Sequence, residues 1–196
     1  MTKLLLLDCD GTIREPIEGR WIDAPRNQKP IEGAAAAIAK AAAAGWTVLG
    51  ITNQGGIAAG HKSLEEVKAE QRVTLELFPE ISSIYFCPDF EGLECWKVER
   101  KKSLEIRQIT EKEFGSFRKP GAGMLRLASL GWDAPEKTWF VGDREEDALA
   151  ASAAGIDFMW SDIWRSLYLK GFQEVDVVDR HLSQEVLLKF LKDFQG

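Results

Sequence analysis

Two aspartates near the amino terminus have the type and spacing of catalytic carboxylates. Asp8 and Asp10 come directly after a run of leucines at residues 4–7, which predicts a buried strand that ends in a polar tip. Side chains two residues apart on extended backbone project to the same side, so both carboxylates can face one ion or substrate. Two like charges are stable together only when a cation joins them, and Mg2+ prefers oxygen ligands. The alternative is an acidic turn without a catalytic role, because Asp and Gly are common turn formers.

A second polar tip follows residues 46–52, an apolar stretch that predicts another buried strand. Thr52 and Asn53 stand at its end, before Gln54 and a pair of glycines. A hydroxyl, an amide and flexible glycines can present hydrogen-bond donors to a phosphate. Ligands of open α/β sheets bind at the carboxyl ends of the strands, so we expect the two tips to share one site.

Two further tips carry charge. Lys119 precedes a proline-started helical pattern that closes at residue 130, and its ammonium could reach a phosphate near the positive end of that helix. Asp143 follows a predicted strand at residues 138–142, and Asp147 would share a face with it if a helix began there. The two carboxylates would add a second pair of metal ligands. Taken singly, each residue also fits a simpler role, as a surface lysine or as an acid that suits a helix dipole.

These tips need a scaffold in which strands and helices alternate. Such alternation favours an α/β fold with a parallel sheet covered by helices. Ser63, with Glu66 three residues later, has the pattern of a helix capping box. Two stretches without clear periodicity, residues 12–30 and 87–118, are expected to be loop insertions. The predicted strands are 4–7, 46–52, 84–86, 138–142, 156–160 and 175–178. The predicted helices are 32–44, 63–78, 103–114 and 182–194, together with one that follows residues 118–124 and runs to residue 130 and one that starts at the acidic tip and continues through residues 148–154.

Composition sets broad limits on the function. The chain has 196 residues, and we expect residues 1–196 to form one domain with a sizeable core. Its 25 basic and 31 acidic residues give a net charge of −6, which disfavours a surface that binds nucleic acid non-specifically. No apolar run approaches the roughly 18 residues that indicate a membrane span, and the cysteines fit thiols in a reducing compartment. We therefore expect a cytoplasmic monomer without a membrane partner.

Four arginines are candidate contacts for an anionic substrate. Arg14, Arg20 and Arg26 lie in the loop insertion that follows the first tip, and Arg118 lies beside Lys119. Guanidinium groups bind phosphate with bidentate geometry, which makes arginines near a phosphate site candidate ligands. The alternative for the first three is a solvated loop without contact to the substrate.

The order of the tips along the chain resembles that of the haloacid dehalogenase-like (HAD) phosphatase superfamily. The matching motifs are Asp8-x-Asp10-Gly11-Thr12, Thr52-Asn53, Lys119 and Gly142-Asp143-x-x-x-Asp147, and the resemblance covers residues 4–159. Residues 51–60 and 118–124 resemble the subclass IIIA branch, which contains heptose bisphosphate phosphatases, histidinol phosphatases and polynucleotide 3′-phosphatases. The resemblance implies a Rossmann-like parallel sheet with helices on both faces. We expect no large cap domain, because sheet-layer elements and modest loops occupy the chain between the motifs.

The resemblance assigns the chemistry to the first motif. Asp8 would be the nucleophile that attacks phosphorus and becomes an aspartyl phosphate. Asp10 would protonate the leaving oxygen and later activate the hydrolytic water, while its backbone carbonyl helps to hold Mg2+.

The other motifs would bind the phosphoryl group and the metal. Thr52 and Lys119 would bind the transferring phosphoryl group, with Asn53 supporting that loop. Asp143 would ligate Mg2+ together with Asp8, and Asp147 would assist directly, through water or through a neighbouring side chain. The metal and the lysine would neutralise phosphoryl oxygens so that an anionic nucleophile can approach.

The resemblance therefore implies a magnesium-dependent phosphomonoester hydrolase. We expect a small phosphorylated metabolite as its substrate, such as a sugar phosphate or bisphosphate. An open site is also compatible with a polynucleotide 3′-phosphatase acting on DNA or RNA ends; the basic cluster at residues 97–119 argues for this alternative and the net charge argues against it. A third alternative is a non-catalytic binding module of the same fold, which the complete set of acidic and basic motifs disfavours.

The sequence departs from its relatives in one respect. Many heptose bisphosphate phosphatases of this branch carry a zinc-binding loop with cysteines and a histidine. Cys87 and Cys95 are present here, but His61 and His181 lie outside that segment. Asp89 could replace one ligand, yet a structural zinc site normally has four, so we do not expect zinc. The difference also weakens the transfer of a heptose substrate to this chain.

Overall fold

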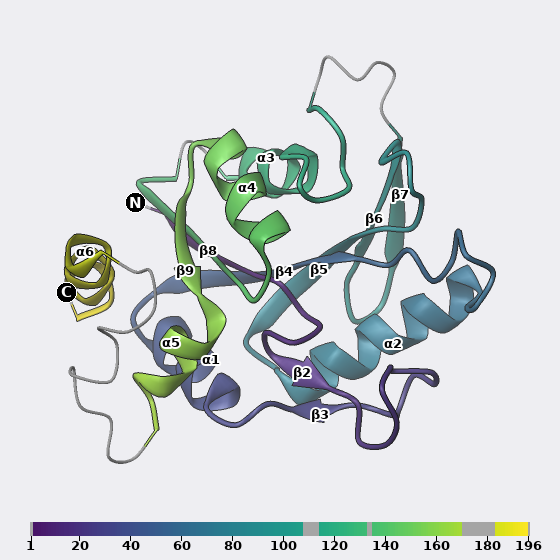
Figure 1. Cartoon of the computed structure of the whole chain (residues 1–196), viewed down its shortest axis with the longest axis horizontal. Helices are drawn as coiled ribbons and strands as arrows, with labels where there is room; N and C mark the ends of the chain where they lie inside the picture. Colours follow the sequence, from purple (N-terminus) through teal and green to yellow (C-terminus); the bar gives the residue numbers. More distant parts are fainter. Residues whose placement is uncertain (1, 108–113, 133–134, 170–182, 196) are drawn as a thin grey trace.

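A seven-stranded sheet forms the centre of the molecule, with strand order β7-β6-β5-β4-β1-β8-β9 (Figure 1). The computed structural model describes residues 2–107, 114–132, 135–169 and 183–195. Strands β5, β4, β1, β8 and β9 are parallel, whereas β6 and β7 continue the sheet in antiparallel fashion. The strands are β1 (Lys3–Leu7), β4 (Trp46–Asn53), β5 (Ile81–Cys87), β6 (Glu94–Val98), β7 (Ser103–Arg107), β8 (Lys137–Gly142) and β9 (Asp157–Trp160).

Helices cover both faces of the sheet, which confirms the predicted α/β fold. Side chains of α1, α2, α5 and α6 pack in one apolar cluster, and those of α3 and α4 pack in another. Figure 1 shows α3 and α4 on one side of the sheet and α1, α2 and α5 on the other. The helices are α1 (Ala34–Ala43), α2 (Leu64–Leu77), α3 (Gly123–Leu130), α4 (Glu145–Ala154), α5 (Ser161–Ser166) and α6 (Gln184–Gln195).

The leucine run of β1 is explained by its central place. Leu5 and Leu7 pack into the first cluster and Leu6 into the second, because successive side chains of a strand point to opposite faces. All of these side chains are fully buried. A strand covered on both faces therefore reads as a continuous apolar run, as expected for the interior of a parallel sheet.

The carboxyl ends of β4, β1 and β8 lie at one edge of the sheet. Leu7 pairs with Gly50 of β4 and with Val141 of β8. The residues that follow each of these pairs therefore emerge side by side. This register brings the predicted polar tips together, because each tip follows the end of its own strand.

Local sequence signals set several helix ends. Ser63 and Glu66 form the predicted capping box at the start of α2, with Ser63 Oγ accepting a hydrogen bond from Glu66 N. Gly45 has a φ of 81° after α1, and Gly155 has a φ of 70° after α4. Both glycines adopt the left-handed backbone that commonly ends helices.

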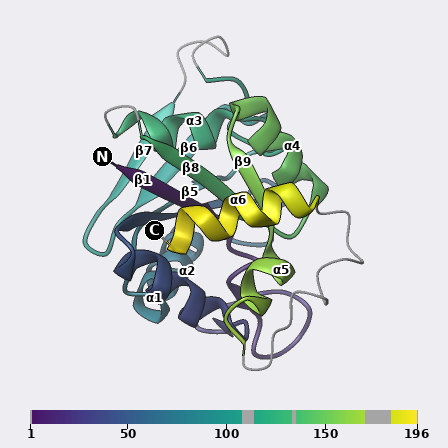
Figure 2. The ribbon, with the colours of Figure 1, turned by 90° about the vertical axis from the view of Figure 1, so that its left-hand side faces the viewer.

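The terminal helix α6 lies across one face of the sheet (Figure 2). Its Phe194 stacks on Trp46, with ring centroids 4.1 Å apart, and its Phe190 meets Trp139 edge-on at 5.0 Å. The predicted helix at 182–194 is thus confirmed within a residue or two. The predicted strand at 175–178 lies outside the described residues.

The segment expected to be a loop insertion at 87–118 contains regular structure. The prediction of a helix from residue 103 was wrong, because Ser103–Arg107 is strand β7, paired antiparallel with β6. Leu104 and Ile106 alternate with polar residues, which is the period of a strand, but Leu104 is exposed and the pattern is short. The 12–30 stretch likewise contains a two-stranded ribbon of β2 (Arg14–Glu15) and β3 (Lys29–Pro30). Within the described residues, no large cap domain is inserted.

Candidate active site

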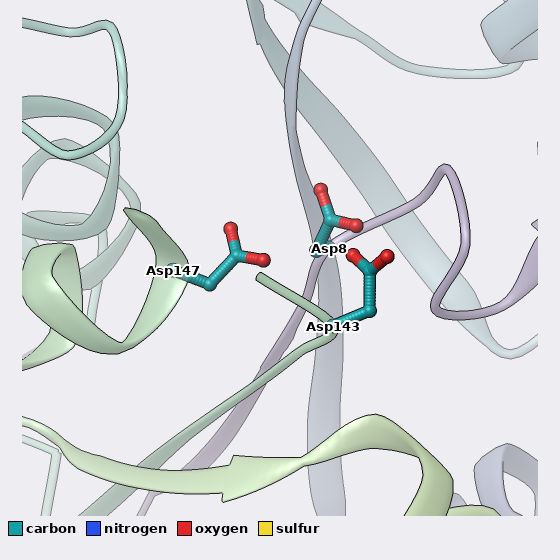
Figure 3. A group of neighbouring side chains, drawn as sticks. All are labelled: Asp8, Asp143 and Asp147. Carbon is teal, nitrogen blue, oxygen red and sulfur yellow. The ribbon is translucent and has the colours of Figure 1, made fainter. Parts of the chain in front are cut away.

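Three carboxylates meet at the carboxyl edge of the sheet. Asp8 follows β1, Asp143 follows β8, and Asp147 lies in the first turn of α4. Their ligand oxygens lie within 4.8 Å of one another. Figure 3 shows the side chain of Asp147 directed toward those of Asp8 and Asp143. A cluster of carboxylate oxygens suits a hard divalent cation such as Mg2+.

Lys119 lies between two of these carboxylates. Its Nζ is 2.6 Å from Asp8 Oδ1 and 2.6 Å from Asp147 Oδ1, and it donates to the backbone oxygen of Ile51 at 3.3 Å. The lysine side chain is only 2% exposed. Burial by itself would lower the pKa of Lys119, but the two carboxylates outweigh burial and raise it above its usual value. The lysine is therefore a fixed positive charge at the nucleophile position.

The carboxyl group of Asp8 carries a strongly perturbed pKa. Burial disfavours its charged form and raises the pKa to about 7, with Asp147 and Asp143 acting in the same direction. The Lys119 ammonium opposes this rise. The pKa of Asp143 is also raised, first by burial and then by Asp147. A bound divalent cation would counter both effects, because it favours the ionised carboxylates.

The tip of β4 fixes the lysine and reaches the second aspartate. Asn53 Oδ1 accepts a hydrogen bond from Lys119 N at 3.0 Å, and Asn53 Nδ2 donates to Lys119 O at 3.0 Å. Gln54 Nε2 donates to Asp10 Oδ2 at 2.9 Å, and Thr52 Oγ1 lies 3.4 Å from the same oxygen. Asn53 thus joins the tip of β4 to the backbone of Lys119, and its supporting role in phosphate binding stays a prediction. The contact of Gln54 with Asp10 was not predicted, although Gln54 had been noted at this tip.

Asp10 is not a member of the carboxylate trio, and its side chain bonds to other partners. Arg14 Nε donates to Asp10 Oδ1 at 2.9 Å. Burial would raise the pKa of Asp10, but the charge and hydrogen bond of Arg14, with smaller effects from Lys62 and Gln54, hold it below the usual value. Asp10 therefore favours the carboxylate form in the absence of substrate. Its predicted contribution to the metal through the backbone carbonyl stays a prediction.

Arg14 was expected to contact the substrate, but its side chain lies inside the protein. Its side chain is fully buried, and its Nε and Nη2 bind Asp10 and Glu70. The expectation that Arg14 faces a substrate is corrected here, because its guanidinium nitrogens are already engaged by protein acceptors. The reason is the helix α2, which brings Glu70 beneath the ribbon of β2 and β3.

The other predicted arginines lie in different surroundings. Arg20 stacks over Trp21, with 5.1 Å from Cζ to the ring centroid. Arg26 is 81% exposed and lies 3.9 Å from Glu76. Arg118 packs over Phe90 at 5.3 Å. Of these three, Arg118 is the neighbour of Lys119 in the sequence, and its guanidinium lies beside Gly55 after the tip of β4.

Arg165, which the sequence did not point to, and Gly11 of the first motif shape the loop after β1. Arg165 of α5 donates to Thr12 O at 2.6 Å and to Gly11 O at 3.2 Å. Gly11 has a φ of 85°, and a Cβ at this position would lie 3.0 Å from Asp143 Cγ. Only glycine combines this backbone with so close an approach to Asp143. No sequence signal linked Arg165 to this loop, because α5 itself was not predicted.

The cysteines considered as zinc ligands are buried thiols. Cys87 Sγ donates to Asp89 Oδ1 at 3.2 Å, and Cys95 lies fully buried on the neighbouring strand. Burial raises the pKa of both thiols, and for Cys87 the nearby Asp89 adds to the rise. Both cysteines therefore favour the neutral thiol over the thiolate that binds metals.

Known proteins with similar sequences are sugar bisphosphate phosphatases. The family model described as HAD-hydrolase-like matches residues 116–162. The chain is 36% identical over 160 residues to the D-glycero-beta-D-manno-heptose-1,7-bisphosphate 7-phosphatase of Pseudomonas putida, covering 78% of each chain. It is 32% identical over 157 residues to the enzyme of the same name from Rhodopseudomonas palustris, covering 76% of this chain and 78% of the relative.

A solved structure has the same fold. The D,D-heptose 1,7-bisphosphate phosphatase from B. bronchiseptica, complexed with magnesium and phosphate, matches with a TM-score of 0.59 and 25% identity. The match covers 80% of this chain and 79% of that chain. Among the described residues, no helix is long and apolar enough to cross a membrane.

Proposed function

The chain belongs to the HAD phosphatase superfamily, and we propose that it is a magnesium-dependent phosphomonoester hydrolase acting on a sugar phosphate or bisphosphate. The proposal depends most on the position of Lys119, whose Nζ lies 2.6 Å from oxygens of both Asp8 and Asp147. A fixed cation beside a buried carboxylate is what a phosphoryl group needs when an anionic nucleophile approaches it.

The charge of the carboxylate trio supports a divalent metal. When Asp8, Asp143 and Asp147 are ionised they carry three negative charges, and Lys119 supplies one positive charge, which leaves a local charge of −2. Arg144 approaches Asp143 only to 4.0 Å and is more than half exposed, so solvent screens this pair. Asp8, Asp143 and Asp147 would hold Mg2+, which would neutralise the phosphoryl oxygens.

The proposed mechanism assigns one task to each side chain. An oxygen of Asp8 attacks phosphorus, the bond from phosphorus to the leaving oxygen breaks, and that oxygen takes a proton from Asp10. A phosphate dianion beside Asp10 raises the proton affinity of this carboxyl group, which enables it to act as an acid. Water then attacks the aspartyl phosphate, Asp10 accepts the proton of the water, and the bond from phosphorus to Asp8 breaks.

The substrate class rests on the relatives. The relatives named above act on a heptose bisphosphate, and we propose a related phosphorylated sugar here. The buried cysteines, which the structure leaves as free thiols, are compatible with a reducing compartment. A cytoplasmic location is therefore part of the proposal, and we keep the predictions of a single domain and a monomer alongside it.

A substrate panel tests this function. Purified protein is assayed for phosphate release from sugar phosphates and bisphosphates, histidinol phosphate, nucleotides and 3′-phosphorylated oligonucleotides. We expect turnover of a sugar substrate that EDTA abolishes and Mg2+ restores. Asp8→Asn should be inactive, whereas the matched control Asp157→Asn, at the opposite end of the sheet, should retain activity. Turnover of oligonucleotides alone would favour a polynucleotide 3′-phosphatase and refute the proposed substrate class.

A further inference from the structure

Arg14 is a fully buried cation whose partners come from separate segments of the chain. Its Nε donates to Asp10 Oδ1 at 2.9 Å, and its Nη2 donates to Glu70 Oε1 at 2.7 Å. Its Nη1 donates to Gln28 Oε1 at 3.2 Å and to Thr74 Oγ1. Each guanidinium nitrogen therefore has an acceptor within the protein, and the planar group is fixed on all of its edges.

Asp10 is held from two opposite sides. Arg14 binds its Oδ1, while Gln54 Nε2 donates to its Oδ2 at 2.9 Å from the tip of β4. A carboxylate with one free oxygen could rotate, but one with both oxygens bound has a single orientation. The geometry thus defines the direction in which Asp10 can exchange a proton.

The cluster around Arg14 is electrically balanced. Glu70 Oε2 accepts from Lys62 Nζ at 2.5 Å, so two carboxylates and two cations lie together. Gln28 Nε2 donates to the backbone oxygen of Glu70 at 3.0 Å and so ties the ribbon to α2. Arg14 is fully buried and is paired with two carboxylates, Asp10 and Glu70, which matters because a buried ion without its partner is strongly unfavourable.

The backbone around the turn places Arg14 in reach of Asp10. Arg14 N donates to Cys9 O at 3.1 Å, and Gly11 N donates to Arg14 O at 3.0 Å. A role limited to joining the ribbon to α2 would need only the contact with Glu70. The additional hydrogen bond from Arg14 Nε to Asp10 connects the buried pair of Arg14 and Glu70 to the catalytic residues that follow β1.

We propose that Arg14, held by Glu70, is a positioning residue that fixes Asp10 for the hydrolysis of the aspartyl phosphate. The inference rests on the proposed function, since it assigns a task within that site. In the hydrolysis step Asp10 must accept a proton from water at a fixed position relative to phosphorus. A misplacement of about 1 Å in such a group can cost roughly 100-fold in rate.

The step that Arg14 serves can be separated from the first step. 4-Nitrophenyl phosphate has a leaving group that departs as the anion, so phosphorylation of Asp8 by this ester does not need a proton from Asp10. Hydrolysis of the aspartyl phosphate still needs Asp10 as the base. Loss of the clamp on Asp10 should therefore make the phosphorylated enzyme accumulate, while a loss of folded protein should not.

The experiment compares Arg14→Met and Arg14→Lys with the wild type. Turnover of 4-nitrophenyl phosphate with Mg2+ is measured together with the fraction of protein that carries acid-stable trapped phosphate during turnover. We expect Arg14→Met to lose at least about tenfold in turnover per folded molecule while the phosphorylated fraction rises. Arg14→Lys should be partly rescued. The control Arg72→Met, which removes an arginine from helix α2 near Glu70, should match the wild type in both measurements.

Two outcomes would overturn the inference. Unchanged turnover in Arg14→Met would remove the positioning role, and lower turnover without a rise in the phosphorylated fraction would indicate a structural role alone. If Arg14→Met does not fold because Glu70 loses its buried arginine partner, the double variant Arg14→Met/Glu70→Met removes both charges and is held to the same two criteria. Failure of the proposed function would look different, because the wild type would then form no phosphorylated protein or Asp8→Asn would still form it.

Discussion

Asp8→Asn should stabilise the metal-free protein while it abolishes catalysis. In the absence of metal, the pKa of Asp8 is raised from 3.8 to about 7, mainly by burial. A group whose pKa is raised on folding contributes fully to stability below its unfolded pKa, and that contribution is lost as the pH rises through the folded value. The wild type should therefore lose stability between about pH 4 and pH 7, whereas asparagine, which carries no charge, should not.

The size of the effect follows from the shift. A rise of about three units in the pKa of Asp8 corresponds to about 4 kcal/mol of folding free energy, at about 1.36 kcal/mol per pKa unit. This value is an upper limit, because the folded site can relax and take up water when Asp8 ionises. Lys119 keeps an anionic partner in the variant, since Asp147 Oδ1 lies 2.6 Å from its Nζ. Asparagine also has nearly the shape of the protonated aspartic acid, so packing is preserved. The gain at pH 8 should thus lie on the order of 2–4 kcal/mol.

Urea unfolding in EDTA at pH 5 and pH 8 measures this difference. We expect Asp8→Asn to exceed the wild type clearly at pH 8 and by much less at pH 5. Saturating Mg2+ should close the gap at pH 8, because the ion stabilises the ionised wild-type site more than the neutral variant. Equal stability of the two proteins at pH 8 without metal, or a variant less stable than the wild type, would refute this account of Asp8.

Three further substitutions have defined outcomes. Lys119→Met should reduce kcat/KM for 4-nitrophenyl phosphate by roughly 10²- to 10³-fold, as is typical when a charged group at the transition state is removed; a reduction below tenfold would contradict its role. Gly11→Ala should cost about 1–3 kcal/mol in urea unfolding and lower activity, because the φ of 85° is strained for alanine and its Cβ would crowd Asp143. Ser63→Ala should cost about 1 kcal/mol through loss of the capping box to Glu66, with kcat unchanged.

Strand ends carried most of the information that the sequence offered about the fold. The strands β1, β4 and β8 are buried on both faces, so each reads as an apolar run that stops at a polar residue. The hairpin of β6 and β7 was missed because it lies at the edge of the sheet, where Leu104 is exposed and charged residues interrupt the pattern. Apolar periodicity reports burial, and edge strands are buried too little to show it.

The residues of the site also fall into those that the sequence predicted and those that it did not. Asp8, Lys119 and Asp143 were predicted because each stands at the end of a strand or before a helix, and the register of the sheet brings them together. The burial of Arg14 could not be predicted, because it depends on Glu70, 56 residues away on α2. A charged residue in an irregular stretch reads as solvated until its partner is placed in space.

Asp8 and Asp10, the two aspartates of the first motif, lie in side-chain clusters of different net charge. Asp8 belongs to a trio of carboxylates with one lysine, and the charges of this group balance only when a divalent cation is bound. Asp10 belongs to a cluster in which Glu70 is the second anion and Arg14 and Lys62 are the cations, so that cluster is neutral without metal. Because the side-chain partners of Asp10, Arg14 and Gln54, lie outside the carboxylate trio, removal of the metal should stop attack at phosphorus while these hydrogen bonds to Asp10 remain. The metal would then act on the nucleophile and the phosphoryl group, while the folded protein alone orients the acid and base.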